Sequence, residues 1–388
     1  MATGSLAVKC GKYYGIISTS SDDKSHKGRR QKWINLEIPE KNGKRAAQKK
    51  LNEILLTYDD DEKMRAVTIL DILNLYIEDS KLRNAPSTYS NNYFMYKGHL
   101  QPYFSNHPHL ELDKLTSNDI EKYYQSLRKK GLSESSIARQ HRMINAAFNQ
   151  AMKEKLITEN IMEDVKTPSE EYHEANFYDI DQLNELFQFA KGSTIYTEIL
   201  LATFLGLRRG EILGLQWKNI DLTNRKVKIQ VNVTPGVDEN GRETVVISEK
   251  LKTKKSTRSL ILPESLTEYL KDLKKQQDER KRILGSYYNQ KYKEFVCVDE
   301  MGNLHRPNYI SLTFRRMIRK SGLPYTSFHD LRHSCATMLI SLGFSMKAVQ
   351  EQLGHSMYTT TANTYAHVYD RTKQEIADKA GSVLPILK

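Results

Sequence analysis

Short apolar stretches, separated by polar or glycine-containing segments, mark the N-terminal part of the chain. The stretches are residues 6–8, 13–17 and 33–38. Runs of this kind predict three short β-strands, and the pattern from about 44 to 56 predicts a helix after them. The acidic run Asp59–Glu62 then predicts a flexible linker. Residues 1–65 are therefore expected to form a small module of their own.

Apolar positions recur at helical spacing through the next part of the chain. The predicted helices are 67–77, 89–100, 117–129 and 133–155. Pro102 is expected to stop the second of them, because proline cannot donate a backbone hydrogen bond. Four apolar side chains of the last helix are available for a core: Ile137, Ile144, Ala147 and Phe148. The polar segment that begins at Pro168 separates this helical region, 66–168, from the rest.

Helices and strands both occur in the remaining part, 175–388. The predicted helices include 183–190, 195–206 and 264–282, and the predicted strands are 227–233, 244–248 and 258–262. Asp181 is expected to cap the first of these helices, and Asn240-Gly241 indicates a turn between strands. The whole pattern predicts a multidomain chain, mainly α with small β-sheets. It has an N-terminal three-stranded sheet plus a helix, a helical middle domain and a mixed α/β C-terminal domain.

Helix start and stop signals are dense between residues 326 and 368. Ser327 and Asp330 form a capping-box-like pair, and the helix that they start is expected to end at Gly343. A shorter helix, 345–353, stops at Gly354 and delivers His355 just past its end. The threonines of 359–361 are suited to cap a last helix that carries Tyr365.

Composition narrows the class of partner. The chain has 388 residues, a length that predicts two or three domains, and its 39% hydrophobic content is enough for ordinary globular cores. Its net charge of +12 favours a polyanionic partner. The alternative interpretation is a basic protein whose charge serves only its solubility. Three scattered cysteines have no zinc or disulfide spacing, which fits a reducing cytoplasm. Neither a signal peptide nor an apolar run of membrane-spanning length is evident.

Two short constellations are suited to bind phosphate. His329 and Arg332 share one face in the first turn of a predicted helix, where free backbone N–H groups also favour anions. Arg208 and Glu211 have i, i+3 spacing, so the carboxylate could orient the guanidinium and leave its planar fork for two phosphate oxygens. No acidic cluster suited to Mg²⁺ is evident, which argues against a two-metal nuclease and predicts neither a metal nor a cofactor.

Four blocks carry a close resemblance to a known family. They are Gly206-Leu-Arg208-Arg-Gly-Glu211, His329-Asp-Leu-Arg332-His, Leu353-Gly-His355-Ser and Tyr365-Ala-His-Val. Their types and order resemble those of the tyrosine recombinases, the phage integrase family, most of all integrases of conjugative transposons, genomic islands and temperate phages. Lys252 matches the mobile active-site lysine of the family, with Lys254 and Lys255 as neighbouring alternatives. Tyr358 and Tyr369 are alternatives to Tyr365 at less typical spacing.

The resemblance implies a domain plan and a catalytic set. The plan is an arm-type DNA-binding domain, 1–65, a helical core-binding domain, 66–168, and a catalytic domain, 175–388. The implied catalytic residues are Arg208, Lys252, His329, Arg332, His355 and Tyr365. In this reading the tyrosine attacks a DNA phosphodiester and holds a 3′-phosphotyrosyl bond. The arginines and His355 stabilise the transition state, Lys252 protonates the leaving 5′-oxygen and His329 accepts a proton.

The implied partner is double-stranded DNA, bound at core and arm attachment sites by four protomers. An excisionase or a host DNA-bending protein is a further expected partner, and the expected location is the bacterial cytoplasm, on DNA. Basic residues suited to contact phosphates are Lys24, Lys27, Arg29, Arg30, Lys32, Arg139, Arg142 and Lys153. A solvated basic surface is the alternative reading of these charges. For the whole chain, the alternatives are a non-catalytic DNA-binding relative or an enzyme similar to a type IB topoisomerase.

Overall fold

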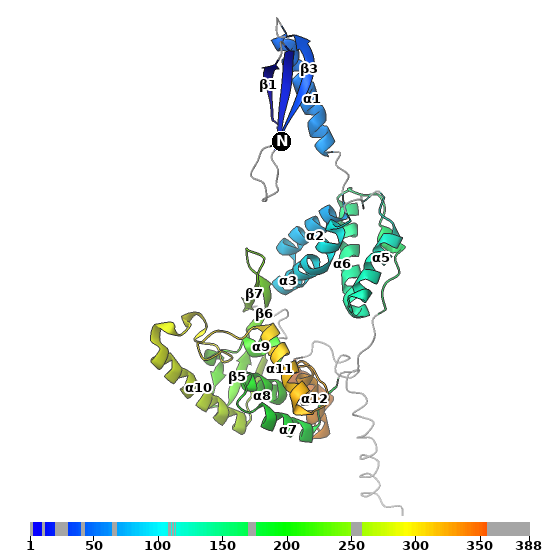
Figure 1. The fold of residues 1–388 in the computed structure, drawn as a ribbon. Coiled ribbons are helices and arrows are strands. Elements are labelled where there is room, and N and C mark those ends of the chain that lie inside the picture. The colour runs from blue at the N-terminus through cyan, green and yellow to red at the C-terminus, as the bar shows by residue number, and fades with distance from the viewer. Residues whose placement is uncertain are drawn as a thin grey trace, which may run out of the picture. The chain divides into compact units, whose positions relative to one another are not determined.

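The computed structural model describes most of the chain (Figure 1). The described residues are 3–9, 12–19, 30–39, 43–63, 68–107, 110, 112, 114–169, 176–249 and 258–354. The chain divides into two compact units. One contains the residues up to Tyr76 together with Gly98–Pro168, and the other contains Ile77–Lys97 together with the residues from Ser169 onward.

The N-terminal module is an antiparallel sheet covered by one helix. Its strands are β1 (Thr3–Lys9), β2 (Lys12–Thr19) and β3 (Arg30–Pro39), in the order β1-β2-β3, and the helix is α1 (Lys44–Lys63). Leu36 and Leu51 are fully buried between the sheet and the helix, and this burial holds the two together. The three predicted strands are confirmed. The predicted acidic linker at 59–62 is wrong, because these residues continue α1, where each added residue gains a helical hydrogen bond.

The following region is helical, as predicted. Its helices are α2 (Ile69–Arg83), α3 (Pro86–Met95), α4 (Gln101–Ser105), α5 (Ser117–Lys129) and α6 (Glu134–Lys153), with a π-helical turn at Tyr96–Leu100. The four apolar side chains predicted for the core of α6 are all buried. Pro102 does not stop the chain's helical path, contrary to the prediction. It lies in the first turn of α4, where an amide hydrogen is dispensable, directly after the π-helical turn.

Seven α-helices are described in the C-terminal part. They are α7 (Ile180–Ala190), α8 (Tyr196–Leu205), α9 (Arg209–Leu213), α10 (Glu264–Leu284), α11 (Pro307–Ser321), α12 (Asp330–Ser341) and α13 (Met346–Leu353). The cap of α7 is Asp179 and not Asp181, because Asp179 and Gln182 bond reciprocally to each other's backbone amide. Asp181 lies inside the first turn, where the negative charge of a carboxylate interacts favourably with the helix dipole.

The strands of this part form two small antiparallel arrangements. The first sheet has the order β4 (Ile220–Asp221), β5 (Lys226–Ile229) and β8 (Arg258–Ile261), and the second pairs β6 (Asn232–Val237) with β7 (Glu243–Ser248). The predicted strand 227–233 is therefore two strands. The break lies where Val231 packs on Gly214, at which a Cβ atom would meet the Val231 carbonyl oxygen at 2.2 Å. Gly241 has φ +75° in the turn between β6 and β7, so the predicted turn is confirmed.

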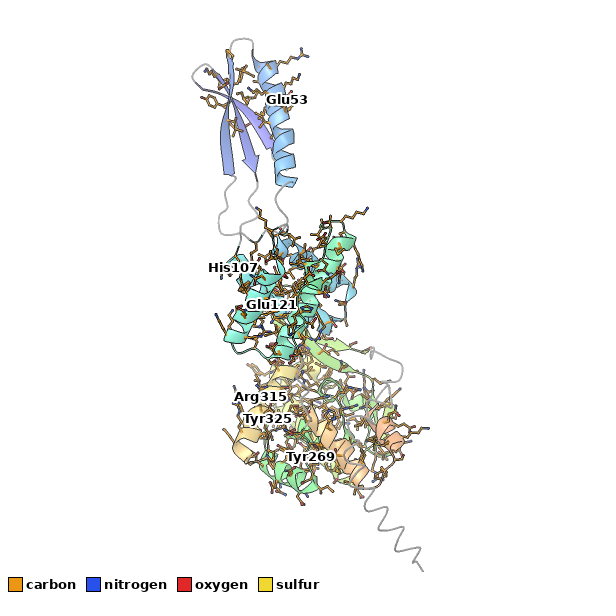
Figure 2. The ribbon with its side chains drawn as sticks, turned by 90° about the vertical axis from the view of Figure 1, so that its right-hand side faces the viewer. Glu53, His107, Glu121, Tyr269, Arg315 and Tyr325 are labelled. Carbon is orange, nitrogen blue, oxygen red and sulfur yellow. The ribbon has the colours of Figure 1, made fainter. Side chains whose placement is uncertain are left out.

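Two apolar clusters organise the C-terminal part. The larger one joins α7, α8, α9, β5, β8, α10 and α11 to the start of α12, and α8 is its most buried helix. The smaller cluster packs α12 against α13 through Ala336, Ile340, Val349 and Leu353. Polar groups also link elements, as at Tyr269 of α10 (Figure 2), whose hydroxyl lies 2.7 Å from that of Thr197. None of the described helices combines the length and apolar character needed to cross a bilayer.

Candidate active site

Arg208 lies at the turn between α8 and α9. Gly206 ends α8 with φ +61°, and Arg208 then takes the N-cap position of α9. Its Nη1 donates to Glu211 Oε1 at 2.9 Å, and its backbone amide donates to Glu211 Oε2 at 3.0 Å. The Arg208 side chain keeps 39% of its surface exposed while Glu211 is buried. The carboxylate thus orients a guanidinium that remains open to solvent, as the i, i+3 spacing predicts.

Glu211 has a second arginine partner, Arg258, at the start of β8. Arg258 Nη1 donates to Glu211 Oε1 at 3.2 Å, and Nη2 donates to Oε2 at 3.0 Å. Burial alone would raise the pKa of Glu211, but the hydrogen bonds and charges of Arg258 and Arg208 outweigh burial and lower it. Sequence reasoning missed Arg258, because this contact joins residues 47 positions apart and no local spacing indicates it.

Arg332 projects from the first turn of α12 into the protein interior. It is 2% exposed, its Nη1 donates to the carbonyl oxygen of Gly206 at 2.5 Å, and its Nη2 donates to that of Leu353 at 2.8 Å. The turn before α12 is held by Asp330, whose carboxylate accepts from the Ser327 amide at 2.8 Å. Arg332 therefore connects the ends of α8 and α13 across the site.

Three guanidinium groups meet the carbonyl end of α13. Arg258 Nε donates to Gln352 at 3.1 Å, and Arg208 Nη2 donates to Gly354 at 3.3 Å, while Arg332 donates to Leu353 between them. The last carbonyl groups of a helix have no partner within the helix and carry partial negative charge. The three arginines satisfy these carbonyls, and the chain passes from this end directly to His355.

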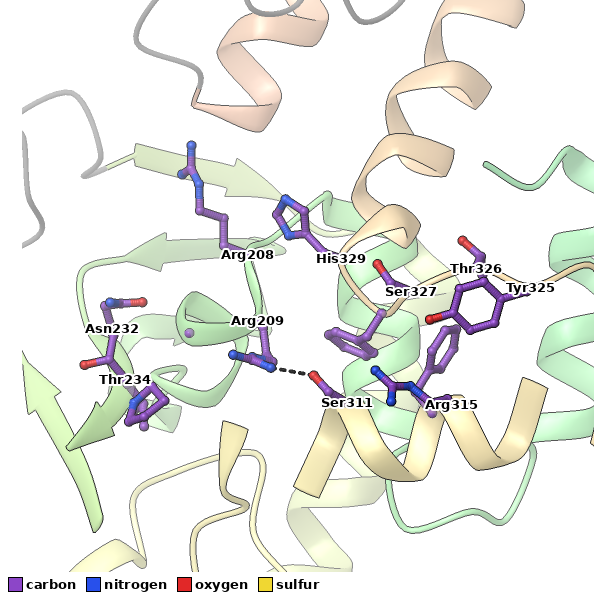
Figure 3. A pocket seen from close by; sticks show the side chains of 15 residues that line it. Arg208, Arg209, Asn232, Thr234, Ser311, Arg315, Tyr325, Thr326, Ser327 and His329 are labelled. Atoms are coloured by element: carbon purple, nitrogen blue, oxygen red, sulfur yellow. Dashed lines mark hydrogen bonds between the residues drawn. The ribbon is translucent and has the colours of Figure 1, made fainter. Parts of the chain in front are cut away.

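His329 precedes α12 and lies beside Arg208 in the site (Figure 3). His329 is exposed to the pocket, yet the protein atoms around its ring displace much of the water near it. This desolvation, followed by the charges of His333 and Arg332, lowers the pKa of His329 to about 4. The ring of His333 lies edge-on to that of His329, with 5.6 Å between their centres, and burial lowers its pKa as well. At neutral pH His329 is therefore uncharged and has a nitrogen that can accept a proton.

A pocket of about 430 Å³ opens between α9, β6, α11 and the segment before α12. Arg208, Arg209, Arg315 and His329 contribute to its lining (Figure 3). None of the described residues that line it is acidic, so the pocket favours an anion. Arg209, the sequence neighbour of Arg208, donates to the Ser311 hydroxyl of α11, and burial lowers its pKa. The two adjacent arginines therefore have different partners.

Several predicted residues lie outside the described part of the chain or have side chains that are not described. Lys252, His355 and Tyr365 lie outside it, as do Lys24, Lys27 and Arg29. Arg30 and Lys32 belong to β3, and only their backbone is described. Arg139, Arg142 and Lys153 are exposed on α6, and their spacing places them along one side of that helix.

Comparison with known proteins gives the family. Residues 176–372 match the phage integrase family, and residues 68–167 match the phage integrase SAM-like domain. The tyrosine recombinase XerC-like protein of Caldanaerobacter subterraneus subsp. tengcongensis is 31% identical, over 96% of this chain and 97% of that protein. The ICEBs1 integrase of Bacillus subtilis is 26% identical, over 83% of this chain and 85% of that one.

Solved structures of integrases share the fold of this chain. The Tn1549 transposon integrase in complex with transposon right end DNA has a TM-score of 0.59 and 22% identity, and the match covers 80% of this chain and 99% of that one. A lambda integrase tetramer bound to a Holliday junction has a TM-score of 0.54 and 19% identity, covering 92% and 94%. The family matches define a tyrosine site-specific recombinase, an enzyme that exchanges DNA strands. The chain belongs to the phage integrase family.

Proposed function

We propose that the chain integrates and excises a mobile element by cutting DNA through a 3′-phosphotyrosyl intermediate at Tyr365. The observation that carries this proposal is the arrangement of Arg208 and His329 beside a pocket whose described lining has no acidic residue. A scissile phosphate in that pocket would meet a guanidinium already oriented by Glu211. An uncharged imidazole would lie close by.

The proposed reaction needs only groups of the enzyme and of its DNA substrate. The Tyr365 phenol forms a bond to phosphorus as the bond to the 5′-oxygen breaks, and its proton passes to His329. Lys252 gives a proton to the leaving 5′-oxygen. Arg208 and Arg332 stabilise the charge that develops on the nonbridging oxygens, and His355 adds a hydrogen bond. Because the phosphotyrosyl bond retains the energy of the broken phosphodiester, resealing requires no nucleotide cofactor.

Arg332 is buried, so it has to become accessible to a phosphate oxygen in this scheme. Its guanidinium donates to two backbone carbonyl oxygens, those of Gly206 and Leu353. A guanidinium carries five N–H donors, so it is able to keep part of this network and still bind a phosphate oxygen. We therefore propose that Arg332 reaches the DNA after a small local adjustment, whereas Arg208 is already exposed.

We also propose the domain roles and the assembly. Residues 1–65 bind arm-type sites, 66–168 bind the core site and 175–388 carry the chemistry. The exposed basic side of α6, formed by Arg139, Arg142 and Lys153, contacts DNA phosphates. Four protomers act on two duplexes, because each active site cuts one strand. A lambda integrase tetramer on a Holliday junction supports this assembly by analogy. An excisionase or a host DNA-bending protein completes the expected set of partners.

The decisive experiment traps the covalent intermediate. Purified protein is mixed with a nicked duplex that carries the junction sequence of the mobile element, so that the strand beyond the cut diffuses away. Wild-type protein should give a covalent protein–DNA band on a denaturing gel, and Tyr365→Phe should give none. Tyr358→Phe and Tyr369→Phe are matched controls that test the two neighbouring tyrosines. Binding of the duplex without an adduct, or an adduct that survives Tyr365→Phe, would refute the proposed nucleophile.

A further inference from the structure

Arg258 is held at the site by several hydrogen bonds within the protein. Its side chain is 9% exposed, and all three of its guanidinium nitrogens donate hydrogen bonds within the protein, two to Glu211 and one to the Gln352 carbonyl. Its position leaves little surface for a phosphate, in contrast to Arg208, whose side chain is 39% exposed. The role of Arg258 is therefore to be sought in the groups that it holds.

The groups that Arg258 holds belong to two parts of the proposed active site. Glu211 receives Arg258 on both carboxylate oxygens and uses the same two oxygens to hold Arg208. Gln352 lies in the last turn of α13, whose final carbonyls also receive Arg332 and Arg208. Arg258 thus connects β8 to the α9 turn and to the end of α13. Without it, Glu211 would be a buried carboxylate with only Arg208 as its described cationic partner.

We propose that Arg258 is a positioning residue that sets the orientation of Arg208 through Glu211 and anchors the carbonyl end of α13. This inference rests on the proposed phosphate-binding role of Arg208. With Arg258 present, part of the charge of Glu211 is neutralised and Arg208 has a fixed partner. The exposed side of the Arg208 guanidinium is therefore already oriented for a phosphate before DNA binds. Without Arg258, Glu211 draws Arg208 inward to compensate the buried charge, and the guanidinium is less available to the phosphate.

A lysine at position 258 cannot form the same set of hydrogen bonds. Its ammonium group is a compact charge on a flexible chain, whereas the planar guanidinium reaches two carboxylate oxygens and a carbonyl in a fixed geometry. Arg258→Lys therefore keeps the charge and removes the geometry. Arg282→Lys is a matched control, because Arg282 forms an exposed two-point contact with Glu279 on α10, at 3.0 Å and 2.6 Å, outside the site.

The test compares two DNA substrates in single-turnover cleavage of the nicked duplex. One has a normal scissile phosphate, and the other has a methylphosphonate there, which lacks one charged nonbridging oxygen and so has less need of Arg208. On the phosphate, Arg258→Lys should cleave roughly 10- to 100-fold more slowly than wild type, the scale of a misplaced catalytic group. On the methylphosphonate, wild type should cleave only about 3-fold faster than Arg258→Lys, or less, because the charge that Arg208 stabilises is gone. The difference in rate between wild type and Arg208→Ala should likewise be smaller on the methylphosphonate than on the phosphate.

Further variants separate this role from loss of folding. Thermal denaturation and DNA affinity of Arg258→Lys are measured beside the rates, which are compared at equal folded protein. Glu211→Gln and the Glu211→Gln/Arg258→Lys double variant complete a cycle, in which the double variant should be little slower than the slower single variant. Equal wild-type and Arg258→Lys rates, an unchanged ratio on the methylphosphonate, or additive effects would each overturn the proposal. Failure of wild-type protein to form an adduct would instead refute the proposed function itself.

Discussion

Arg332 and Gly206 are joined by a hydrogen bond that links two distant segments of the chain. The buried guanidinium of Arg332 donates to the Gly206 carbonyl oxygen at 2.5 Å, across 126 positions of sequence. Gly206 presents this oxygen because it ends α8 in the left-handed conformation, with φ +61°. The glycine that ends one helix therefore positions an arginine from another, and that arginine is one of the proposed catalytic residues.

Gly206→Ala should lower the free energy of unfolding more than Gly192→Ala does. Both glycines have positive φ, so each alanine pays a backbone cost of about 1–2 kcal/mol. At Gly206 a Cβ atom would also lie 2.3 Å from Leu353 Cδ2, and Leu353 is fully buried, whereas nothing lies within 4 Å at Gly192. Overpacking adds roughly 1–3 kcal/mol at Gly206 alone. Urea denaturation measures both variants, and equal losses would contradict the close packing of Leu353 against Gly206.

Arg332→Lys should lose both stability and DNA cleavage. The lysine cannot reach the Gly206 and Leu353 carbonyls together, so at least one buried acceptor loses its partner, at a cost of about 1–3 kcal/mol. The cleavage rate should fall by roughly 10²–10³, the usual effect of removing one transition-state donor. Chemical denaturation and single-turnover cleavage are the two measurements. A variant with wild-type stability would show that these two hydrogen bonds contribute little to folding.

His329 should titrate near pH 4 in the free protein. Its pKa in the folded chain, about 4, lies below the ordinary value of 6.5, so the unfolded chain binds more protons between these two pH values. The free energy of unfolding should therefore fall as the pH drops through that window, and His329 should contribute no slope above it. NMR of ¹³C-labelled histidine measures the midpoint directly, and His329→Gln assigns the signal. A midpoint near pH 6.5 would show that desolvation does not lower the pKa of His329.

Cys297 and Cys335 should resist alkylation in the folded protein. Both thiols are buried, and burial raises the pKa of Cys335 to about 12 and that of Cys297 well above its usual range. Because the thiolate is the reactive form, iodoacetamide should modify neither at pH 8 until the chain is unfolded. Mass spectrometry of a Cys10→Ser protein, with and without guanidinium chloride, follows the two sites alone. Equal rates in both conditions would show that these thiols are accessible in the native state.

Local patterns were sufficient for most of the secondary structure. The limits of α5, Ser117–Lys129, agree with the prediction. The Ser345 side chain caps the start of α13, and Gly354 ends that helix in a left-handed conformation, also as predicted. The errors arose where an isolated signal competed with its neighbours. Acidic residues at 59–62 do not interrupt α1, and Pro102 is tolerated beside a π-helical turn. Asp179 outcompeted Asp181 because Gln182 completes its reciprocal cap.

The sequence by itself determined the class of protein, the order of its motifs and the pairing of Arg208 with Glu211. These features are short in range, because an i, i+3 spacing on a helical turn brings two side chains together whatever the rest of the chain does. Only the tertiary structure decided that Arg258 shares Glu211, that Arg332 is buried against two carbonyls, and that the pKa of His329 is lowered. Such contacts depend on how distant elements pack and exclude water, and no local pattern of residues encodes that packing.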